Sequence, residues 1–298
     1  MNPADELNRR IAQIAADNSS GASEILNDVV AILRDGRDAG LPLLPLARAL
    51  VRAQPTMASV WNAAVSAMAS RDAEDRLQRF ADRAARAPAA IARVFADFIG
   101  PDAPHRRPGA PFRLVTLSFS GTLLTVLDTL RQTWALEVAC SDSRPALEGR
   151  RLAARLAASG IPVTLFTDAA IGHALRHTDA VVLGADAIGP EWVMNKSGTR
   201  PLASAAVHDG VPVYVLCGRD KFVSSALADR LVSREGEASE VWDAPPAGIA
   251  IRNPYFEATS LDLITAVISD IGALGAALVP AACEAVHDAA ALRALAEL

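Results

Sequence analysis

Residues 112–144 read FRLVTLSFSGTLLTVLDTLRQTWALEVACSDSR, and this stretch decides the fold. Two short apolar runs, Phe112–Ser118 and Leu136–Ser141, flank a longer helical pattern over Thr122–Trp134. Strands that are apolar on both faces are typical of a parallel sheet covered by helices on each side. The stretch therefore predicts one strand–helix–strand unit of such a sheet.

The same alternation continues toward the C-terminus, with strand-like runs at Ile161–Thr167, Ala180–Gly184 and Val211–Cys217. Helical stretches separate them at Leu147–Ser159, Ala169–His177 and Thr199–His208. Crossovers between parallel strands are right-handed, so the alternation predicts an α/β, Rossmann-like layered domain. Further on, the stretch Leu261–Leu278 is strongly apolar, and a dimer face in place of domain core is an interpretation that stays open.

Upstream of this region, the chain from Asp5 to about Gly100 has helical periodicity throughout. The run from Pro101 to Pro111 holds four prolines and a glycine, which cannot continue a helix. The predicted organisation is a helical domain over 1–104, a linker over 105–111 and a Rossmann-like ligand-binding domain over 112–298.

Net charge and hydropathy argue against nucleic-acid binding and against a membrane protein. The net charge of −5 provides no field that would attract nucleic acid, and we expect no direct contact with it. No signal sequence and no apolar run of membrane-spanning length are evident, so the predicted location is cytoplasmic, away from membranes.

His173 and His177 have the spacing of a metal pair but no third ligand nearby. We therefore expect neither a metal nor a cofactor. The four tryptophans are interpreted as packing residues.

Ligands of an open parallel sheet bind at the carboxyl ends of its strands. The residues that follow the predicted strands are Ser118–Gly121, Asp142–Arg144, Asp168, Asp186 and Gly218–Lys221. Serines at a helix N-terminus can hold phosphate oxygens, and Arg144 can add a forked contact. Asp168 or Asp186 can accept a proton. This set predicts a small, phosphorylated, hydroxyl-rich ligand, although Asp and Ser at strand ends also serve simply as helix caps.

A series of motifs then accumulates in order along the second half of the chain: Asp142-Ser143-Arg144-Pro145, Leu147-Glu148-Gly149, Thr167-Asp168-Ala169, Gly184-Ala185-Asp186, Asn195-Lys196 and Asn253-Pro254-Tyr255-Phe256-Glu257. Residues 112–272 resemble the family that unites methylthioribose-1-phosphate isomerase and ribose-1,5-bisphosphate isomerase with the α, β and δ subunits of initiation factor 2B. The resemblance implies a helical domain before a Rossmann-like domain. It also implies a homodimer or a higher even oligomer.

In the enzymes of this family a cysteine and an aspartate form the catalytic pair. Asp186 matches the aspartate, but Ser118 stands in the place of the thiol. A serine hydroxyl is a much poorer proton carrier near neutral pH. Ser20 and Gln54 stand where the enzymes have arginines, so phosphate binding also departs from the family pattern.

The resemblance implies a set of retained ligand-binding residues: Gly21, Ala22, Ser120, Arg144, Asn195 and Lys196. For Asn195 and Lys196 a second interpretation stays open, in which they brace the loop before the next helix. Cys140 is either a substitute for the missing thiol or a buried hydrophobic residue.

Two hypotheses follow. In the first, the protein resembles an initiation factor 2B subunit and binds a sugar phosphate or a nucleotide, with the catalytic cysteine absent. In the second, it is an aldose–ketose isomerase for a phosphorylated pentose that uses Asp186 together with Ser118 or Cys140.

Overall fold

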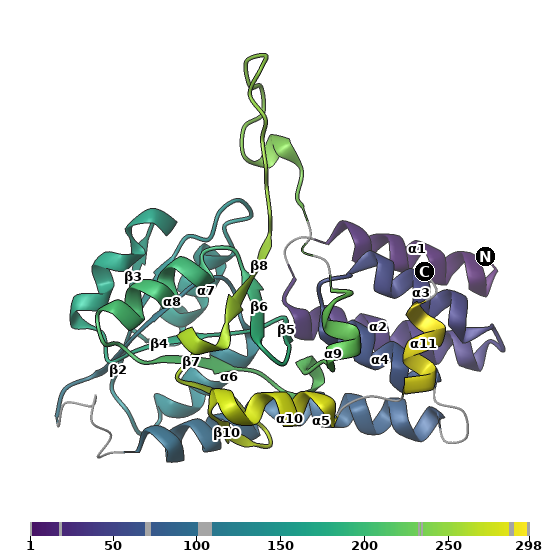
Figure 1. Cartoon of the computed structure of the whole chain (residues 1–298), viewed down its shortest axis with the longest axis horizontal. Coiled ribbons are helices and arrows are strands. Elements are labelled where there is room, and N and C mark those ends of the chain that lie inside the picture. The colour runs from purple at the N-terminus through teal and green to yellow at the C-terminus, as the bar shows by residue number, and fades with distance from the viewer. Residues whose placement is uncertain are drawn as a thin grey trace.

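The computed structural model describes residues 2–17, 20–68, 73–100, 109–231, 233, 235–285 and 289–296. A lobe of helices lies beside a lobe built on a seven-stranded sheet (Figure 1). The predicted α/β class, with helices preceding a Rossmann-like sheet, is confirmed. Most of the predicted linker lies outside the described residues, so the domain bounds stay a prediction. Within the described ranges, no helix is both long enough and apolar enough to cross a bilayer.

Five helices build the first lobe: α1 (Pro3–Ala16), α2 (Ala22–Asp38), α3 (Leu43–Ala53), α4 (Ala58–Met68) and α5 (Ala73–Ile99). Their apolar residues recur at helical spacing and meet in one core, where Val29 and Leu33 are fully buried. α1 begins at Pro3 because Asn2 caps it, its Oδ1 accepting a hydrogen bond from the Ala4 backbone N–H at 3.2 Å.

The second lobe contains strands β1 (Phe112–Thr116), β2 (Leu136–Ser141), β3 (Val163–Phe166), β4 (Ala180–Leu183), β7 (Val213–Leu216), β9 (Ala266–Ser269) and β10 (Gly272–Leu274). Their order is β10-β9-β7-β4-β1-β2-β3, and all pairs are parallel except β9 with β10. Helices α6 (Gly121–Leu130), α7 (Glu148–Ala158) and α8 (Thr199–His208) and the 3-10 helix η1 (Asp168–His177) follow the strands. Each of the five predicted strands and four predicted helices is therefore present, with small differences in its bounds.

The apolar segment 261–278 divides into a buried part and an exposed part. Ala266, Val267 and Ile268 form the buried strand β9, which pairs with β7 on one side and β10 on the other. Leu261, Ile264 and β9 therefore belong to the core of the sheet lobe. Ile271 is 44% and Leu278 is 58% exposed, so a dimer face beyond β9 stays a prediction. Hydrophobicity alone could not separate the two interpretations, because both place apolar residues away from water.

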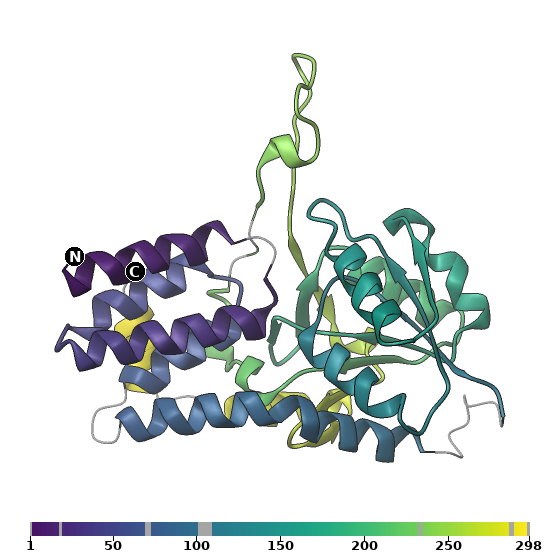
Figure 2. The same cartoon turned by 180° about the vertical axis from the view of Figure 1, so that it is seen from behind.

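Two helices interlock the lobes. The second half of α5, including Ala87, Ile91 and Phe95, packs in the core of the sheet lobe. In return, Leu292 and Leu295 of the C-terminal helix α11 (Ala289–Ala296) pack in the core of the helical lobe. Figure 2 shows α5 running beneath both lobes. Each lobe thus takes part of its core from the far side of the predicted boundary.

A small antiparallel sheet lies between the lobes (Figure 1). It consists of β5 (Ala187–Ile188), β6 (Trp192–Lys196) and β8 (Phe256–Ser260), none of which the sequence analysis predicted. Lys196 at the end of β6 pairs with Phe256 at the start of β8. This sheet places Asn195 and Lys196 at the junction of the two lobes.

An arm formed by residues 235–255 leads into β8 and projects away from both lobes (Figures 1 and 2). The tip of the arm is exposed, and Trp242 is 47% accessible to solvent. The interpretation of all four tryptophans as packing residues is therefore wrong for Trp242. The base of the arm is held by Glu240, whose Oε2 accepts hydrogen bonds from Asn253 and Tyr255.

The docking of α11 leads to a stability prediction. Leu295→Ala should lower the free energy of unfolding by about 2–4 kcal/mol, because a fully buried leucine is removed from the helical-lobe core. Leu278→Ala serves as the control and should change it by less than about 0.5 kcal/mol, since Leu278 is 58% exposed. Chemical denaturation monitored by circular dichroism measures both values. Equal effects of the two substitutions would contradict the docked position of α11.

Candidate functional site

Most of the predicted site residues meet in one cavity between the lobes, at the carboxyl ends of the parallel strands. Its lining includes Gly21, Ala22, Ser118, Ser120, Asp186, Asn195 and Lys196. The volume open to the centre of a water molecule is about 70 Å³, enough for several waters. Because Gln54 and Met57 also line it, both lobes contribute walls. A role in binding stays a prediction for each of these residues.

Two helices begin at this cavity. α2 starts from Gly21, whose N–H donates to Glu24 Oε2 at 2.9 Å. α6 starts from Ser120, whose Oγ accepts from the Leu123 N–H at 3.2 Å. A Cβ atom placed on Gly21 would lie 3.6 Å from the Phe119 ring, so the start of α2 packs directly on the turn that precedes α6. The first N–H groups of a helix lack partners within the helix and favour anions.

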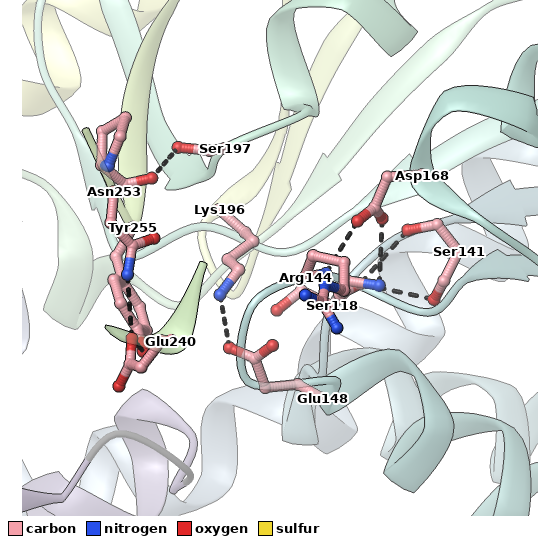
Figure 3. Close-up of polar contacts among 12 residues, drawn as sticks. Ser118, Ser141, Arg144, Glu148, Asp168, Lys196, Ser197, Glu240, Asn253 and Tyr255 are labelled. Atoms are coloured by element: carbon pink, nitrogen blue, oxygen red, sulfur yellow. Dashed lines mark hydrogen bonds and ion pairs between the residues drawn. The ribbon is translucent and has the colours of Figure 1, made fainter. Parts of the chain in front are cut away.

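The positive charges of the cavity come from Lys196 and Lys221, which are the two lysines of a chain with 29 basic residues. Lys196 is 2% exposed, and its Nζ donates to Glu148 Oε1 at 2.7 Å (Figure 3). Its ammonium also lies 4.3 Å from the centre of the Tyr255 ring. The buried Lys221 donates to the Ala185 carbonyl oxygen at 2.6 Å. Both ammonium groups are thus held in place within the protein.

The sequence placed Lys221 among the residues that follow the strands but gave it no specific role, and Glu148 was not predicted as a site residue. Lys221 follows a predicted strand, but nothing in its immediate neighbours distinguished it from a solvent-exposed charge. The scarcity of lysine was the overlooked signal, because a chain that otherwise uses arginine keeps its two lysines in one cavity. Glu148 is the first residue of α7, where an acidic residue is ordinarily explained by the helix dipole.

Asp186 lies in the segment between β4 and β5. Its backbone N–H donates to the Met194 carbonyl at 2.9 Å, and its carbonyl accepts from the Ala58 N–H at 3.1 Å. Desolvation raises the pKa of the carboxyl group. The positive charges of Lys221 and Lys196 oppose this shift, and the negative charge of Glu148 adds to it. Asp186 is therefore poised to hold a proton at a pH where an exposed aspartate would have lost it.

Ser118 occupies a strained position in the turn after β1. Its φ of 63° lies in the left-handed region, as does the φ of 60° at Ser143. The Ser118 N–H donates to the Ser143 Oγ at 2.7 Å, which joins the two turns. Left-handed residues other than glycine cost free energy and cluster at ligand sites. The backbone at Ser118 is therefore held in place by its surroundings.

Arg144 and Asp168 lie at the same margin of the sheet but are not among the residues that line the cavity. The carboxylate of Asp168 accepts the N–H groups of Ser143 at 3.0 Å and Arg144 at 2.7 Å (Figure 3). Asp168 thus fixes the turn after β2, which is an alternative to the proton-accepting role considered from sequence. Arg144 is exposed, and its contact with a ligand stays a prediction.

Ser20 and Gln54 stand where the enzymes that this chain resembles have arginines. Both residues line the cavity, but neither carries a charge. Gln54 is buried, and its Nε2 donates to the carbonyl oxygens of Ile14 at 2.7 Å and Asp17 at 3.3 Å. The Ser20 N–H donates to Asp17 Oδ1 at 2.9 Å. These hydrogen bonds join Gln54 and Ser20 to the C-terminal end of α1, and neither side chain presents a cation.

The three cysteines are buried, and none of them lines the cavity. Burial raises the pKa of the Cys140 thiol to about 11 and that of Cys283 to about 12. The pKa of Cys217 is raised by the same cause. Cys140 therefore behaves as the buried hydrophobic residue that was one of its two interpretations. Within the described residues, no group of three or more metal-ligating side chains occurs.

The raised pKa of Asp186 leads to a pH-dependent stability prediction. As pH rises above about 4, the unfolded chain releases the Asp186 proton before the folded chain does, so wild-type stability falls until the pH passes the folded pKa. Asp186→Asn has no proton to lose. It should therefore melt at a higher temperature than wild type at about pH 8, with a smaller difference near pH 4.5.

Asp262→Asn, at an exposed carboxylate of the same lobe, is the matched control and should leave the melting temperature unchanged at both pH values. A lower melting temperature for Asp186→Asn at the higher pH would mean that attraction by the lysines outweighs desolvation. That result would contradict the direction of the pKa shift.

The buried cysteines lead to a reactivity prediction. At about pH 8, a thiol reagent should label the native protein very slowly, because each thiol is buried and has a raised pKa. In denaturant it should label all three cysteines of the chain rapidly. Rapid labelling of Cys140 in the native protein, located by peptide mapping, would restore it as a candidate for the missing thiol.

Known proteins resemble this chain in sequence and in fold. A model of the initiation factor 2 subunit family matches residues 7–276. A methylthioribose-1-phosphate isomerase from Rhodopirellula baltica is 36% identical over 171 residues, which make up 53% of this chain and 48% of that protein. A ribose 1,5-bisphosphate isomerase from Archaeoglobus fulgidus is 37% identical over 145 residues, or 47% of this chain and 46% of that protein. The chain spans about half the length of these curated relatives.

Solved structures share the fold. A translation initiation factor 2B structure from Pyrococcus horikoshii gives a TM-score of 0.76 at 24% identity, covering 91% of this chain and 97% of that one. A tetrameric β2δ2 complex of the same factor from Chaetomium thermophilum gives 0.72 at 15% identity, covering 96% and 95%. With the family model matched across both lobes, the chain is a member of the initiation factor 2 subunit family.

Proposed function

We propose that this protein binds a sugar phosphate or a nucleotide in the cavity between its lobes, with aldose–ketose chemistry impaired by the absence of the family cysteine. The convergence of two helix N-termini and the two buried lysines on Asp186 supports this proposal. Both isomerase relatives are named for phosphorylated sugars. Because the chain spans only about half of each relative, their activity does not transfer to it directly.

The phosphate group of the ligand is assigned to the helix N-termini. Family arginines are absent at Ser20 and Gln54, so a phosphate needs other donors. The N-terminal turns of α2 and α6 offer backbone N–H groups and the positive ends of two helix dipoles. Lys221 adds a full positive charge to the same cavity. Ser118 and Ser120 can contribute hydroxyl groups to the phosphate oxygens.

The chemistry of the site is limited by Ser118. A proton carrier must exchange its proton near the working pH. The serine hydroxyl holds its proton too tightly, and Cys140 is buried away from the cavity. Asp186 retains a suitable group, since its raised pKa favours the acid form.

An aldose–ketose isomerase for a phosphorylated pentose is the second candidate. The raised pKa of Asp186 favours it, because a carboxyl group that can both give and take a proton suits an isomerisation. In this case Ser118 only positions the substrate, and Asp186 carries the proton transfer.

We further propose an even oligomer, a homodimer in the simplest case. The tetrameric complex from Chaetomium thermophilum shares the fold of this chain and supports the proposal. A cytoplasmic location remains the prediction made from the sequence.

Thermal melts with a ligand panel test the proposed function. Ribose 1-phosphate, ribose 5-phosphate, ribose 1,5-bisphosphate and AMP are compared with inorganic phosphate and with unphosphorylated ribose. At least one phosphorylated compound should stabilise the protein by about 2 kcal/mol or more at saturating concentration. Lys221→Gln should lose this stabilisation, because the amide can keep the bond to the Ala185 carbonyl but not the charge. Arg155→Gln, on the exposed surface of α7, should retain it.

The absence of stabilisation by every phosphorylated compound would contradict the proposed function. Assay of the same compounds for aldose–ketose conversion separates the two candidates. Conversion by wild type that disappears in Asp186→Asn would establish the isomerase. Binding without conversion would support the first candidate, and Ser118→Cys should then restore measurable turnover.

A further inference from the structure

Glu148 carries a polar atom that the folded chain leaves without a partner. Its Oε1 accepts the hydrogen bond from Lys196 at 2.7 Å. Its Oε2 is buried, and among the described residues it has no hydrogen-bond partner. The side chain as a whole is 11% exposed and lines the cavity (Figure 3). Only one of the two oxygens of this carboxylate therefore has a hydrogen-bond partner.

A hydrogen-bond donor from outside the chain would remove the cost of this unpaired acceptor. An ionised carboxylate can only accept hydrogen bonds, and its two oxygens together take several. Leaving a buried acceptor unpaired is costly, and native proteins do so rarely. Lys196 already donates to Oε1 and faces the Tyr255 ring. A water molecule or a ligand hydroxyl group in the cavity can supply the missing donor.

The charge of Glu148 restricts what that donor can be. A phosphate group placed beside this carboxylate would be repelled, whereas an alcohol O–H would be accepted. Asp186 provides a second carboxyl group to the same cavity, and the charge of Glu148 acts on it. Two carboxyl groups together match two adjacent hydroxyl groups of a sugar ring.

On the basis of the proposed function, we infer that Glu148 is the specificity-determining residue of the cavity: its free oxygen accepts a hydrogen bond from the vicinal diol of a phosphorylated ribose. The ligand then lies with its phosphate toward the N-termini of α2 and α6 and with its diol toward Glu148 and Asp186. A deoxyribose phosphate cannot supply both hydroxyl groups and is discriminated against.

Paired ligands test this inference. Calorimetric titration compares ribose 5-phosphate with 2-deoxyribose 5-phosphate, and AMP with its 2′-deoxy analogue. Wild type should bind the ribose compound at least about tenfold more tightly, because the deoxy compound leaves a buried acceptor unpaired. In Glu148→Gln the ratio should fall below about threefold, since the amide is neutral and places a donor beside the hydroxyl.

Glu191→Gln is the matched control, because Glu191 is exposed outside the cavity and should leave the ratio unchanged. Thermal melts of both variants without ligand confirm that they are folded. If Glu148→Gln does not fold, Glu148→Asp replaces it: the shorter side chain keeps the charge but withdraws the acceptor, and the ratio should fall in the same way.

The two lysines offer an independent readout. Protein labelled with isotope only in lysine should give two side-chain ammonium signals by nuclear magnetic resonance. The signal that disappears in Lys221→Gln belongs to Lys221, which leaves the other for Lys196. Ribose 5-phosphate should shift the Lys196 signal strongly, since a hydroxyl group on Glu148 changes its ion pair. The deoxy compound should shift it less.

The outcomes separate this inference from the function on which it rests. Equal affinity of wild type for ribose and deoxyribose phosphates would overturn the role of Glu148 and leave phosphate binding intact. Undiminished discrimination in the Glu148 variants would do the same. If none of these compounds binds, both the inference and the proposed function are wrong.

Discussion

The structure depends on the hydrogen bonds that fasten α4 to the loops after the parallel strands. The buried Asn62 side chain donates to the carbonyl oxygens of Asp220 at 2.7 Å and Phe222 at 2.9 Å. One turn earlier, the Ala58 N–H donates to the carbonyl of Asp186. These bonds hold the loops after β4 and β7 against the helical lobe. Because the exchanged helices α5 and α11 strengthen the same junction, the cavity has fixed walls on both sides.

Within those walls the protein maintains a costly cluster of charges. Two buried lysines line one cavity together with the carboxyl groups of Glu148 and Asp186. Opposite charges reduce the cost, but the raised pKa of Asp186 means that desolvation outweighs the attraction there. The unpaired buried oxygen of Glu148 adds to this cost, and in the proposed function a bound ligand completes the cluster.

Three positions differ from the pattern of the family's enzymes, and at each one a reactive or charged side chain is replaced by a neutral polar one. The backbone of Ser118 adopts the left-handed conformation of the turn after β1, but its side chain is a hydroxyl and not a thiol. Gln54 and Ser20 fasten backbone segments where cations stood in the enzymes. In the proposed function, anion binding therefore falls to the helix N-termini and the lysines, whose donors do not depend on those arginines.

Sequence by itself determined the alternation of strands and helices from 112 to 217, because uninterrupted apolar runs and helical periodicity are local properties. It also brought Ser118, Ser120 and Asp186 into one candidate site, since the carboxyl ends of parallel strands share an edge. Tertiary structure alone decided that β9 is core while Leu278 is exposed, that Trp242 is exposed, and that α11 returns to the helical lobe. It also decided the roles of Glu148, Lys221 and Asp168. Whether a charge is paired, buried or free depends on neighbours that lie far away along the chain, and no local pattern records them.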